Sequence, residues 1–275
     1  MMKIVSFNVN SVRQRQHQLQ ALTEQLHPAV IGLQETKVQD HEFPVEPLKA
    51  MGYDAVFTGQ KTHYGVAILY NEQMKLLQSL KGWPHETDPD AQKRMTICDF
   101  ETPSGEMLRI INGYFPQGEN RNHPTKFPAK EKFYQDLMHY LNTECDPNQN
   151  LIVMGDFNIS PEDKDIGIGE QNRKRWLREG KTSFLPEERA WWQTLLDWGL
   201  VDTFRTVHPD ADDCFSWFDY RSRGFNREPK RGLRIDTLLA TVPLNQKVVD
   251  SGICYDIRGM EKPSDHAPVW TEFNL

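Results

Sequence analysis

The sequence has few cysteines and no long hydrophobic run. Its four cysteines, Cys98, Cys145, Cys214 and Cys254, are far apart and form no C-x-x-C pair. This disfavours a disulfide framework or a thiolate zinc site and favours a reducing, cytoplasmic environment. No apolar stretch approaches the roughly 18 residues of a membrane span, and the N-terminal residues become polar too early for a signal peptide. We therefore expect no membrane partner.

A second shortage is positive charge. The 275 residues include 32 Lys and Arg against 39 Asp and Glu, a formal net charge of −7, whereas nucleic-acid-binding proteins often carry a basic patch. Two short windows depart from this balance: residues 173–181 hold five Lys and Arg against one Glu, and residues 221–234 hold six against one. A basic run is commonly a solvated face. Here, however, Trp176, Trp217 and Phe225 are interleaved, and cations beside aromatic rings suit the phosphates and sugars of a nucleic acid.

No Pro- or Gly-rich linker divides the chain, so we predict a single domain over residues 1–275. Hydrophobic residues make up 38% of the sequence, which is enough for a buried core and excludes a disordered chain. Strand-like runs cover residues 3–9, 29–36, 53–58, 65–70, 74–80, 95–101, 107–115, 151–157, 234–241 and 269–273. Helical faces are predicted for Leu19, Leu22 and Leu26, for Phe133, Leu137 and Leu141, and, after a start at Pro186, for Trp191, Leu195 and Trp198. This mixture predicts stacked sheets flanked by helices.

Several strands end in polar residues that a core would not select. These are Asn8, Glu35, Asp156 with Asn158, and Asp236, while Asp265 and His266 stand together near the C-terminus. Each residue alone is typical of a turn or cap, although Glu is not a turn residue, and Asp236 precedes an apolar run where an unpaired carboxylate is costly. Together they predict an oxygen-rich pocket for Mg²⁺ or Mn²⁺, provided that the strand ends converge. Such a pocket beside a His and an Asp is suited to hydrolysis of phosphate esters.

Five segments resemble the bacterial exonuclease III type of apurinic/apyrimidinic (AP) endonuclease, within the endonuclease/exonuclease/phosphatase superfamily. They are IGLQETK at 31–37, NGYFPQG at 112–118, GDFNI at 155–159, GLRID at 232–236 and SDHAP at 264–268. RKRWL at 173–177 and FSWFDYRS at 215–222 narrow the resemblance further. It extends from Lys3 to the C-terminus, with the motifs in family order and no departure at a catalytic position.

The resemblance implies an α/β (α+β) fold, a four-layer α/β sandwich in which two mostly antiparallel β-sheets pack face to face with helices outside. It implies a Mg²⁺-dependent DNA-repair nuclease, for which Mn²⁺ is an expected substitute. The implied activities are 3′→5′ exodeoxyribonuclease, AP endonuclease and 3′-phosphatase or 3′-end-cleaning activity in base excision repair. The implied partner is double-stranded DNA, especially abasic sites and 3′ ends, and the implied oligomeric state is a monomer.

Roles carry over by position. Glu35 resembles the principal metal ligand, with Asn8, Asp156, Asn158, Asp265 and His266 as the other residues of the metal region. Asp156 resembles the residue that activates or orients the attacking water, and Asn158 positions that water and binds phosphate. His266 would contact the scissile phosphate while Asp236 orients its imidazole. Tyr114 would donate to the phosphate or to the leaving oxygen.

The resemblance also implies a DNA-binding surface. Its residues are Gln117, Lys126, Arg173, Lys174, Arg175, Trp217, Phe218 and Arg221. Within this set, Trp217 and Phe218 correspond to the pocket that receives an abasic sugar, because a sugar without a stacked base is easily extruded.

Two alternative functions remain at this point. A phosphoesterase acting on lipid or inositol phosphates would keep the metal site but would not use the basic, aromatic segments. A non-catalytic nucleic-acid-binding protein would have lost one or more catalytic positions, and none is lost. The residues leave open whether one or two metals act, and whether Asp156 or His266 is the general base.

Overall fold

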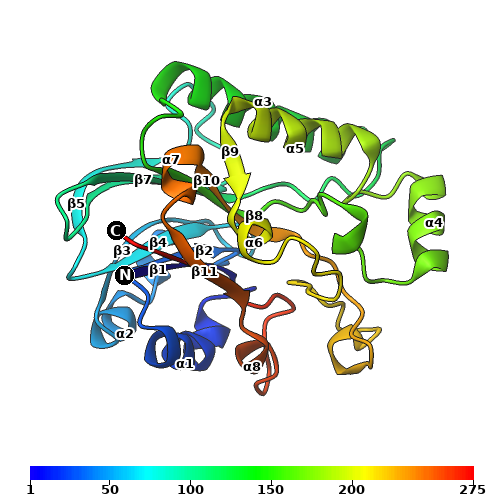
Figure 1. The fold of residues 1–275 in the computed structure, drawn as a ribbon, viewed down its shortest axis with the longest axis horizontal. Coiled ribbons are helices and arrows are strands. Elements are labelled where there is room, and N and C mark those ends of the chain that lie inside the picture. The colour runs from blue at the N-terminus through cyan, green and yellow to red at the C-terminus, as the bar shows by residue number, and fades with distance from the viewer.

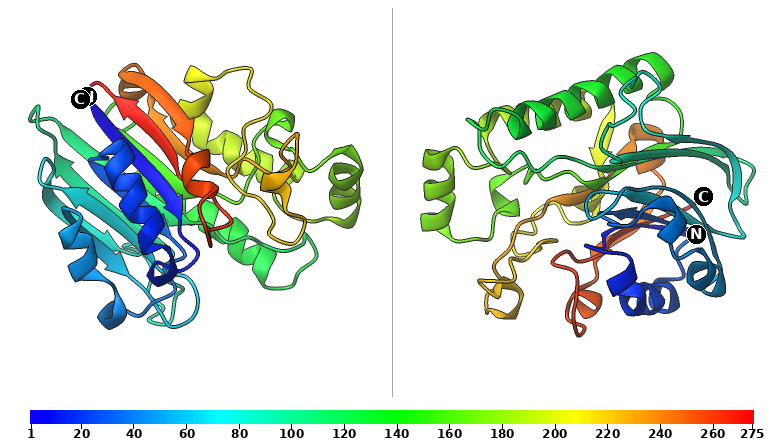
Figure 2. Two further views of the ribbon diagram at one scale, coloured as in Figure 1. Left: turned by 90° about the horizontal axis from the view of Figure 1, so that it is seen from below. Right: turned by 180° about the vertical axis from the view of Figure 1, so that it is seen from behind.

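The computed structural model, which describes residues 1–275, contains two six-stranded β-sheets packed face to face (Figure 1). The first sheet has the order β11 (Val248–Ile253), β12 (Val269–Phe273), β1 (Met2–Asn8), β2 (Val30–Gln34), β4 (Val66–Asn71), β3 (Tyr53–Thr58). The second has the order β5 (Lys75–Lys81), β6 (Met95–Glu101), β7 (Met107–Tyr114), β8 (Leu151–Asp156), β10 (Asp236–Thr241), β9 (Leu200–Asp202). Both chain ends lie in the first sheet, where Met2 pairs with Phe273 (Figure 2).

Each sheet is antiparallel except at its centre. The parallel pairs are β1 with β2 in the first sheet and β7 with β8 in the second. The two sheets therefore share one arrangement, and their central strands β1 and β8 contact each other across the sandwich. Both strands are followed by polar residues at the same end of the molecule, and this common end becomes the floor of the site described below.

Helices cover the outer face of each sheet (Figures 1 and 2). The first sheet is covered by α1 (Gln16–Leu26), α2 (Val45–Ala50) and α8 (Tyr255–Arg258), and the second by α3 (Lys126–Glu144) and α5 (Pro186–Trp198). The remaining helices are α4 (Glu170–Glu179), α6 (Thr203–Val207) and α7 (Val242–Asn245). Short 3₁₀ turns span Arg13–Arg15, Asp40–Glu42, Asp163–Asp165 and Gly224–Asn226. None of the helices combines the length and the apolar character needed to cross a membrane.

Three apolar clusters hold these layers together. One lies between the sheets and draws residues from both, such as Ile4 and Ile110. The other two join each sheet to its helices, for example through Phe133 on α3 and Leu22 on α1. Strands that are buried on both faces explain why their sequences are apolar without strict alternation. The predicted four-layer α/β sandwich is confirmed.

The two sheets approach closely at Gly32 on β2. A Cβ atom at this position would lie 2.5 Å from Cε of Met154 and 2.7 Å from Oδ1 of Asn112, both in the second sheet. The Asn112 amide nitrogen donates across the gap to the carbonyl oxygens of Leu33 and Ala67, each at 3.0 Å. This polar bridge fixes the register of the two sheets beside the residues that end β2, because a buried amide must keep its partners.

The sequence predicted most element positions. Strands 53–58, 95–101 and 269–273 have the predicted bounds, while the other predicted strands differ by one or two residues at their ends. The strands β9 and β11 and the helices α2, α4, α6, α7 and α8 were not predicted. The start of α5 at Pro186 is confirmed. On the predicted face, Leu195 is fully buried, and Trp191 and Trp198 pack partly buried against the same apolar cluster. Trp192 and Glu188, which were not predicted, are also buried, and Glu188 faces a buried lysine on α3.

Candidate active site and nucleic-acid interface

The polar residues at the strand ends converge at one end of the sandwich. Asn8 ends β1, Glu35 follows β2, and His266 lies just before β12, all in the first sheet. Asp156 ends β8 and Asp236 begins β10 in the second sheet, where the two residues are direct cross-strand partners. The convergence that the sequence could only assume is therefore present, and each sheet contributes part of the site.

Asn8 joins the carboxylates of the two sheets. Its Nδ2 donates to Oε2 of Glu35 at 3.1 Å and to Oδ2 of Asp156 at 3.0 Å, and the residue has no exposed surface. Both donors of one amide are thus used, and a carboxylate from each sheet is held on either side of a single nitrogen. This amide fixes the distance between two acidic groups that would otherwise repel each other.

A buried imidazole lies between two carboxylates. Nδ1 of His266 is 2.8 Å from Oδ2 of Asp236, and Nε2 is 3.7 Å from Oδ2 of Asp156. Burial disfavours the charged imidazole, but the two carboxylates outweigh burial and raise the pKa of His266. Burial, together with the charge of Asp236, raises the pKa of Asp156 above its usual value, although His266 opposes this shift. Oδ1 of Asp236 has no hydrogen-bond partner, so the cluster retains an unused acceptor.

Asn158 is held in a turn that favours few side chains. It has a positive φ of 52°, which Asn tolerates better than most residues. Its backbone N–H donates to Oδ1 of Asp156 at 3.0 Å, and its Nδ2 donates to the carbonyl oxygen of Phe115 at 2.9 Å. The turn therefore orients the Asp156 carboxylate through the backbone N–H of Asn158.

Tyr114 lies at the end of β7, directly opposite Asp156 in the parallel pair. Burial, followed by the charges of Glu35 and Asp156, raises the pKa of its phenol well above the usual value. The guanidinium of Arg94 lies 4.8 Å from the centre of the Tyr114 ring and donates to the Tyr114 carbonyl oxygen at 3.0 Å. A phenol that stays protonated in this position is a hydrogen-bond donor, which agrees with the role that the resemblance implies.

Asp265 reaches the acidic centre only through other residues. Its Oδ1 accepts from Nδ2 of Asn10 at 3.0 Å, and its Oδ2 accepts from the indole N–H of Trp217 at 3.1 Å. Nζ of Lys37 donates to Oδ1 of Asn10 at 2.6 Å and lies 3.1 Å from Oε1 of Glu35. Asn10 and Lys37 were not selected from the sequence. The available sequence signal was position: Asn10 lies two residues after Asn8, and Lys37 lies two residues after Glu35 in the Gln-Glu-Thr-Lys segment.

The donor atoms fit a hard divalent cation. Glu35 and Asp156 offer carboxylate oxygens, no thiol is present, and Asp156, Asp236 and His266 have potential ligand atoms within 4.8 Å of one another. The Lys37 ammonium already neutralises Glu35, so this carboxylate faces a cation here. Oxygen donors of this kind are those that Mg²⁺ and Mn²⁺ prefer. Glu35 and the cluster around Asp156 form two acidic positions on opposite sides of Asn8.

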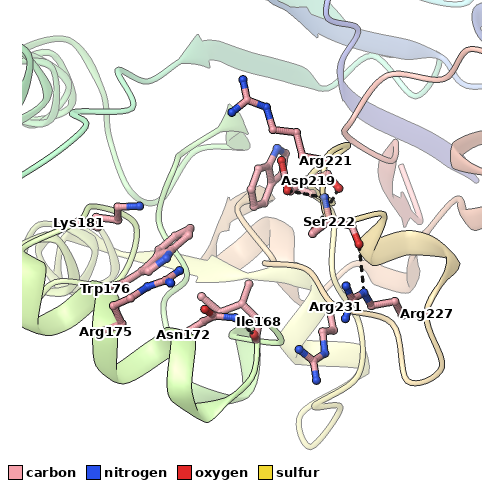
Figure 3. Close-up of a pocket in the computed structure, with 11 residues that line it drawn as sticks. Ile168, Asn172, Arg175, Trp176, Lys181, Asp219, Arg221, Ser222, Arg227 and Arg231 are labelled. Carbon is pink, nitrogen blue, oxygen red and sulfur yellow. Dashed lines mark hydrogen bonds between the residues drawn. The ribbon is translucent and has the colours of Figure 1, made fainter.

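A basic pocket opens beside this site (Figure 3). It has a volume of about 370 Å³ and lies between α4 and the segment 217–231. Its walls carry five cationic side chains against one carboxylate, together with two indole rings; these residues are Arg175, Lys181, Arg221, Arg227, Arg231, Asp219, Trp176 and Trp217. Trp217 belongs both to this pocket and, through Asp265, to the acidic site. The sequence had predicted such a mixture of cations and aromatic rings.

Several residues assigned to the basic surface are placed differently by the structure. Phe218 has no exposed surface, and its ring packs edge-on against Phe215, Phe225 and Tyr255, so it does not face a ligand. Arg234 is 1% exposed and pairs with Asp165 and Asp202, and therefore offers no charge to a partner. Residues 173–179, the larger part of the first basic window, form part of the helix α4.

The cations on α4 are not equally available. Arg173 makes two hydrogen bonds to Glu170, at 2.8 and 3.0 Å, and Lys174 lies 3.4 Å from the same carboxylate. These two cations lower the pKa of Glu170 to about 2, so its carboxylate stays charged at neutral pH and offsets part of their positive charge. Arg175 has no such partner and lines the pocket. Glu170 lies just outside the basic window 173–181, so the charge count of that window does not include the carboxylate that offsets Arg173 and Lys174.

The other two predicted DNA-contacting residues, Gln117 and Lys126, lie on the protein surface. Gln117 is exposed, and its Nε2 donates to Oγ1 of Thr182 at 3.1 Å. Lys126, at the start of α3, is exposed and pairs with Glu119 at 2.5 Å. Another cavity, of about 520 Å³, is lined in part by Asn10 and Lys37 and was not predicted. It is lined only by polar residues, including Arg13, Arg15, Lys37 and Lys61.

The fold and the site define a class of protein, the α/β-sandwich hydrolases that act on phosphate esters at a hard-cation site. The chain belongs to the Endonuclease/Exonuclease/phosphatase family, which matches residues 5–266. It is 57% identical over 272 residues to exodeoxyribonuclease III of Haemophilus influenzae, covering 99% of this chain and 100% of that protein. It is therefore a homologue of exodeoxyribonuclease III and a nuclease-type hydrolase, as the resemblance indicated.

Two solved structures support this assignment over the whole length of both chains. A 3′ phosphatase from Neisseria bound to a product DNA hairpin superposes with a TM-score of 0.88 at 36% identity. An AP endonuclease from Archaeoglobus fulgidus superposes with a TM-score of 0.89 at 31% identity. These relatives are nucleases or act on DNA ends, which favours the nuclease interpretation over the lipid-phosphate and non-catalytic alternatives.

Proposed function

We propose that this DNA-repair nuclease hydrolyses phosphodiester bonds in duplex DNA with Mg²⁺, with Mn²⁺ as a substitute. The proposed activities are 3′→5′ exonuclease, incision at abasic sites, and removal of 3′ phosphates and other 3′-blocking groups in base excision repair. The observation that carries the proposal is the hydrogen bond from Trp217 to Asp265, because it joins the basic, aromatic pocket to the acidic site. A backbone held in that pocket would bring a phosphate to the catalytic end of the sheets.

Glu35 is the proposed principal metal ligand, with Asp156, Asn158, Asp265 and His266 in the surrounding region and Asn8 holding the two carboxylates in place. Bound Mg²⁺ would neutralise the scissile phosphate and polarise its oxygens. Lys37 must yield or share the Glu35 carboxylate when the cation binds, since its ammonium lies 3.1 Å away. This competition is a property of the protein's own residues and sets how tightly the site takes up a divalent ion.

We assign the general base to Asp156. His266 is held in its protonated form by Asp236 and Asp156, so it is a poor proton acceptor and a good donor to a phosphate oxygen. Burial raises the pKa of Asp156, which strengthens this carboxylate as a base for water near neutral pH. Tyr114 remains protonated and is the second donor, directed at the phosphate or at the leaving oxygen.

The proposed substrate preference follows from the shape of the interface. Trp217 is partly exposed and lines the pocket at the point nearest the acidic site, so its ring can pack against a sugar that carries no base. Arg175 and Arg221 lie in the same pocket and are placed to hold flanking phosphates. We further propose that residues 1–275 form one domain and that the protein acts as a cytoplasmic monomer. The pairing of β1 with β12, which joins the two chain ends in one sheet, supports the single domain.

The proposal is tested with duplex DNA that carries one tetrahydrofuran abasic analogue. We expect incision 5′ of the analogue in Mg²⁺ and none in EDTA. Glu35→Ala and His266→Ala should each lower turnover by about 100-fold or more while the duplex is still bound, because they remove groups that stabilise the transition state. Glu46→Ala, an exposed glutamate on α2, is the matched control and should leave turnover unchanged. Absence of incision by the wild-type protein in Mg²⁺ would refute the proposed activity.

A further inference from the structure

A buried lysine lies directly beneath the active-site loops. Lys130, on the inner face of α3, has no exposed surface, and a lysine is almost never fully buried unless it is paired. Its ammonium has three hydrogen-bond donors and three acceptors in reach. It donates to the carbonyl oxygen of Asn158 at 2.8 Å, to that of Gln117 at 3.4 Å, and to Oε1 of Glu188.

The partner of this lysine is equally well held. Glu188 on α5 has no exposed surface, and its Oε2 accepts from the backbone N–H groups of Ser183 and Leu185, each at 2.9 Å. The Lys130 ammonium and both carboxylate oxygens of Glu188 therefore have hydrogen-bond partners, which offsets the cost of burying them. A buried ion pair of this kind adds little to stability compared with two well-packed apolar side chains. The Lys130–Glu188 pair is therefore better explained by a need to hold the groups it contacts in fixed positions than by stability.

The two carbonyl oxygens that Lys130 binds belong to segments with different tasks. Asn158 lies in the turn that orients Asp156, with a positive φ of 52°. Gln117 is exposed and lies three residues after Tyr114, which ends β7. One turn further along α3, the hydroxyl of Tyr134 donates to the carbonyl oxygen of Phe157 at 2.6 Å. One face of α3 thus holds two successive carbonyl groups after β8 and also the neighbouring loop.

We propose that Lys130 is a positioning residue that fixes the Asn158 turn relative to the Gln117 loop, and thereby the catalytic groups relative to the bound DNA. The inference rests on the proposed function, because it concerns how that site is assembled. Glu188 neutralises the ammonium and anchors it to α5, while the two carbonyl oxygens set the spacing of the loops. Loss of Lys130 should therefore affect both the chemical step, through Asn158, and substrate binding, through Gln117.

The test uses the double variant K130M/E188Q, which removes both charges together, so that no carboxylate is left buried without its partner. The glutamine retains a carbonyl oxygen for the N–H groups of Ser183 and Leu185. Steady-state incision of the abasic duplex in Mg²⁺ is measured, and kcat is expressed per folded molecule by circular dichroism. We expect kcat to fall by about 10- to 100-fold, as when the residues that support metal or catalytic groups are lost, and KM for the duplex to rise several-fold. K75M, an exposed lysine on β5, is the control.

A purely structural role for Lys130 predicts a different result. The double variant would then lose stability but, once corrected for its folded fraction, would show kcat and KM within twofold of the wild type, and this would overturn the proposal. If K130M/E188Q does not fold, K130Q/E188Q is judged by the same criterion, since its amide keeps one donor for the carbonyl oxygens and should give an intermediate kcat. Wild-type activity measured in parallel separates the two hypotheses, because an inactive wild-type protein refutes the proposed function and not the role of Lys130.

Discussion

A single imidazole has two carboxylates within reach, and this shapes the chemistry of the site at the scale of residues. Asp236 contacts Nδ1 of His266, whereas Asp156 faces Nε2 at the longer distance of 3.7 Å. The shorter contact fixes the ring orientation, and the longer one is beyond hydrogen-bond distance, which leaves Nε2 available to donate to a phosphate oxygen. The same two acids would have opposite tasks, because Asp236 only orients a donor while Asp156 takes up a proton.

The variant Asp236→Asn tests this division. An amide keeps a hydrogen bond to Nδ1 but not the negative charge, so the pKa of His266 should fall. The imidazole would then lose its proton at a lower pH than in the wild type, and incision by the variant should decline earlier as the pH is raised. We expect turnover near neutral pH to fall by about 10- to 100-fold.

The measurement for this variant is the ¹⁵N chemical shift of the His266 ring as a function of pH, in the metal-free wild-type and variant proteins. The same pKa in both proteins would show that Asp236 does not hold the imidazolium. A lower pKa with unchanged turnover would show instead that the imidazolium is not the acid.

At the scale of elements, a buried ion network fixes the start of β10. Arg234 donates to Asp165 at 2.6 Å and to Asp202 at 2.7 Å, and its backbone N–H donates to the Asp165 carbonyl oxygen at 3.0 Å. Arg205 on α6 pairs with Asp165 as well. The network joins the 3₁₀ turn at Asp163–Asp165, the short strand β9 and the residues just before Asp236. It explains why β10 begins at Asp236 and not, as predicted, at Arg234.

The stability of this network should depend on pH through Asp165. Burial opposes the charged carboxylate, but Arg234 and Arg205 outweigh burial and lower its pKa. A lowered pKa means that the stabilisation is fully present above the unfolded-state value of about 3.9 and is lost as the pH falls through the lower folded-state value. Asp165→Asn should therefore reduce the free energy of unfolding at pH 7, by about 3 kcal/mol, and by less below pH 4.

Urea denaturation of wild-type and Asp165→Asn proteins at both pH values measures this difference. Asp163→Asn, a mostly exposed residue of the same turn, is the control. A destabilisation of equal size at both pH values would show that the charge of Asp165 is not the source of the stability.

The sequence predicted those features that depend on residues adjacent in the chain, and it failed where a feature depends on contacts between distant segments. Glu35 and Asp236 were recognisable because carboxylates at such strand positions are unusual, and the structure brings them into one site. Arg234 was misassigned to the basic surface, since a charge count along the chain cannot distinguish an arginine facing solvent from one facing buried carboxylates. The strand β9 has three residues, too few for any period to emerge. Burial of charge and short pairings depend on contacts between distant segments, which is where prediction from sequence fails.

At the scale of the whole molecule, an acidic protein presents a locally basic face. The net charge is −7, yet the pocket beside the catalytic end has five cations against Asp219 alone (Figure 3). The acidic remainder should oppose loose binding of DNA elsewhere on the surface. The pocket would then determine where and in which orientation the duplex binds, so that few phosphate contacts carry most of the affinity.

This arrangement predicts unequal contributions from neighbouring cations to the salt dependence of DNA binding. Each cation that contacts a phosphate contributes about −0.9 to the slope of log K against log salt concentration. Arg175→Ala and Arg221→Ala should each reduce the magnitude of the slope by about that amount, because both side chains line the pocket. Lys174→Ala should reduce it by less, since Glu170 already pairs with this lysine, and Lys75→Ala on the distant edge strand β5 should leave it unchanged.

Fluorescence anisotropy with a labelled abasic duplex between 50 and 200 mM salt, in EDTA to prevent cleavage, gives the slopes. Equal effects of Arg175→Ala and Lys174→Ala would mean that DNA displaces Glu170 from α4 and that the whole basic face of the helix, not the pocket, binds the duplex.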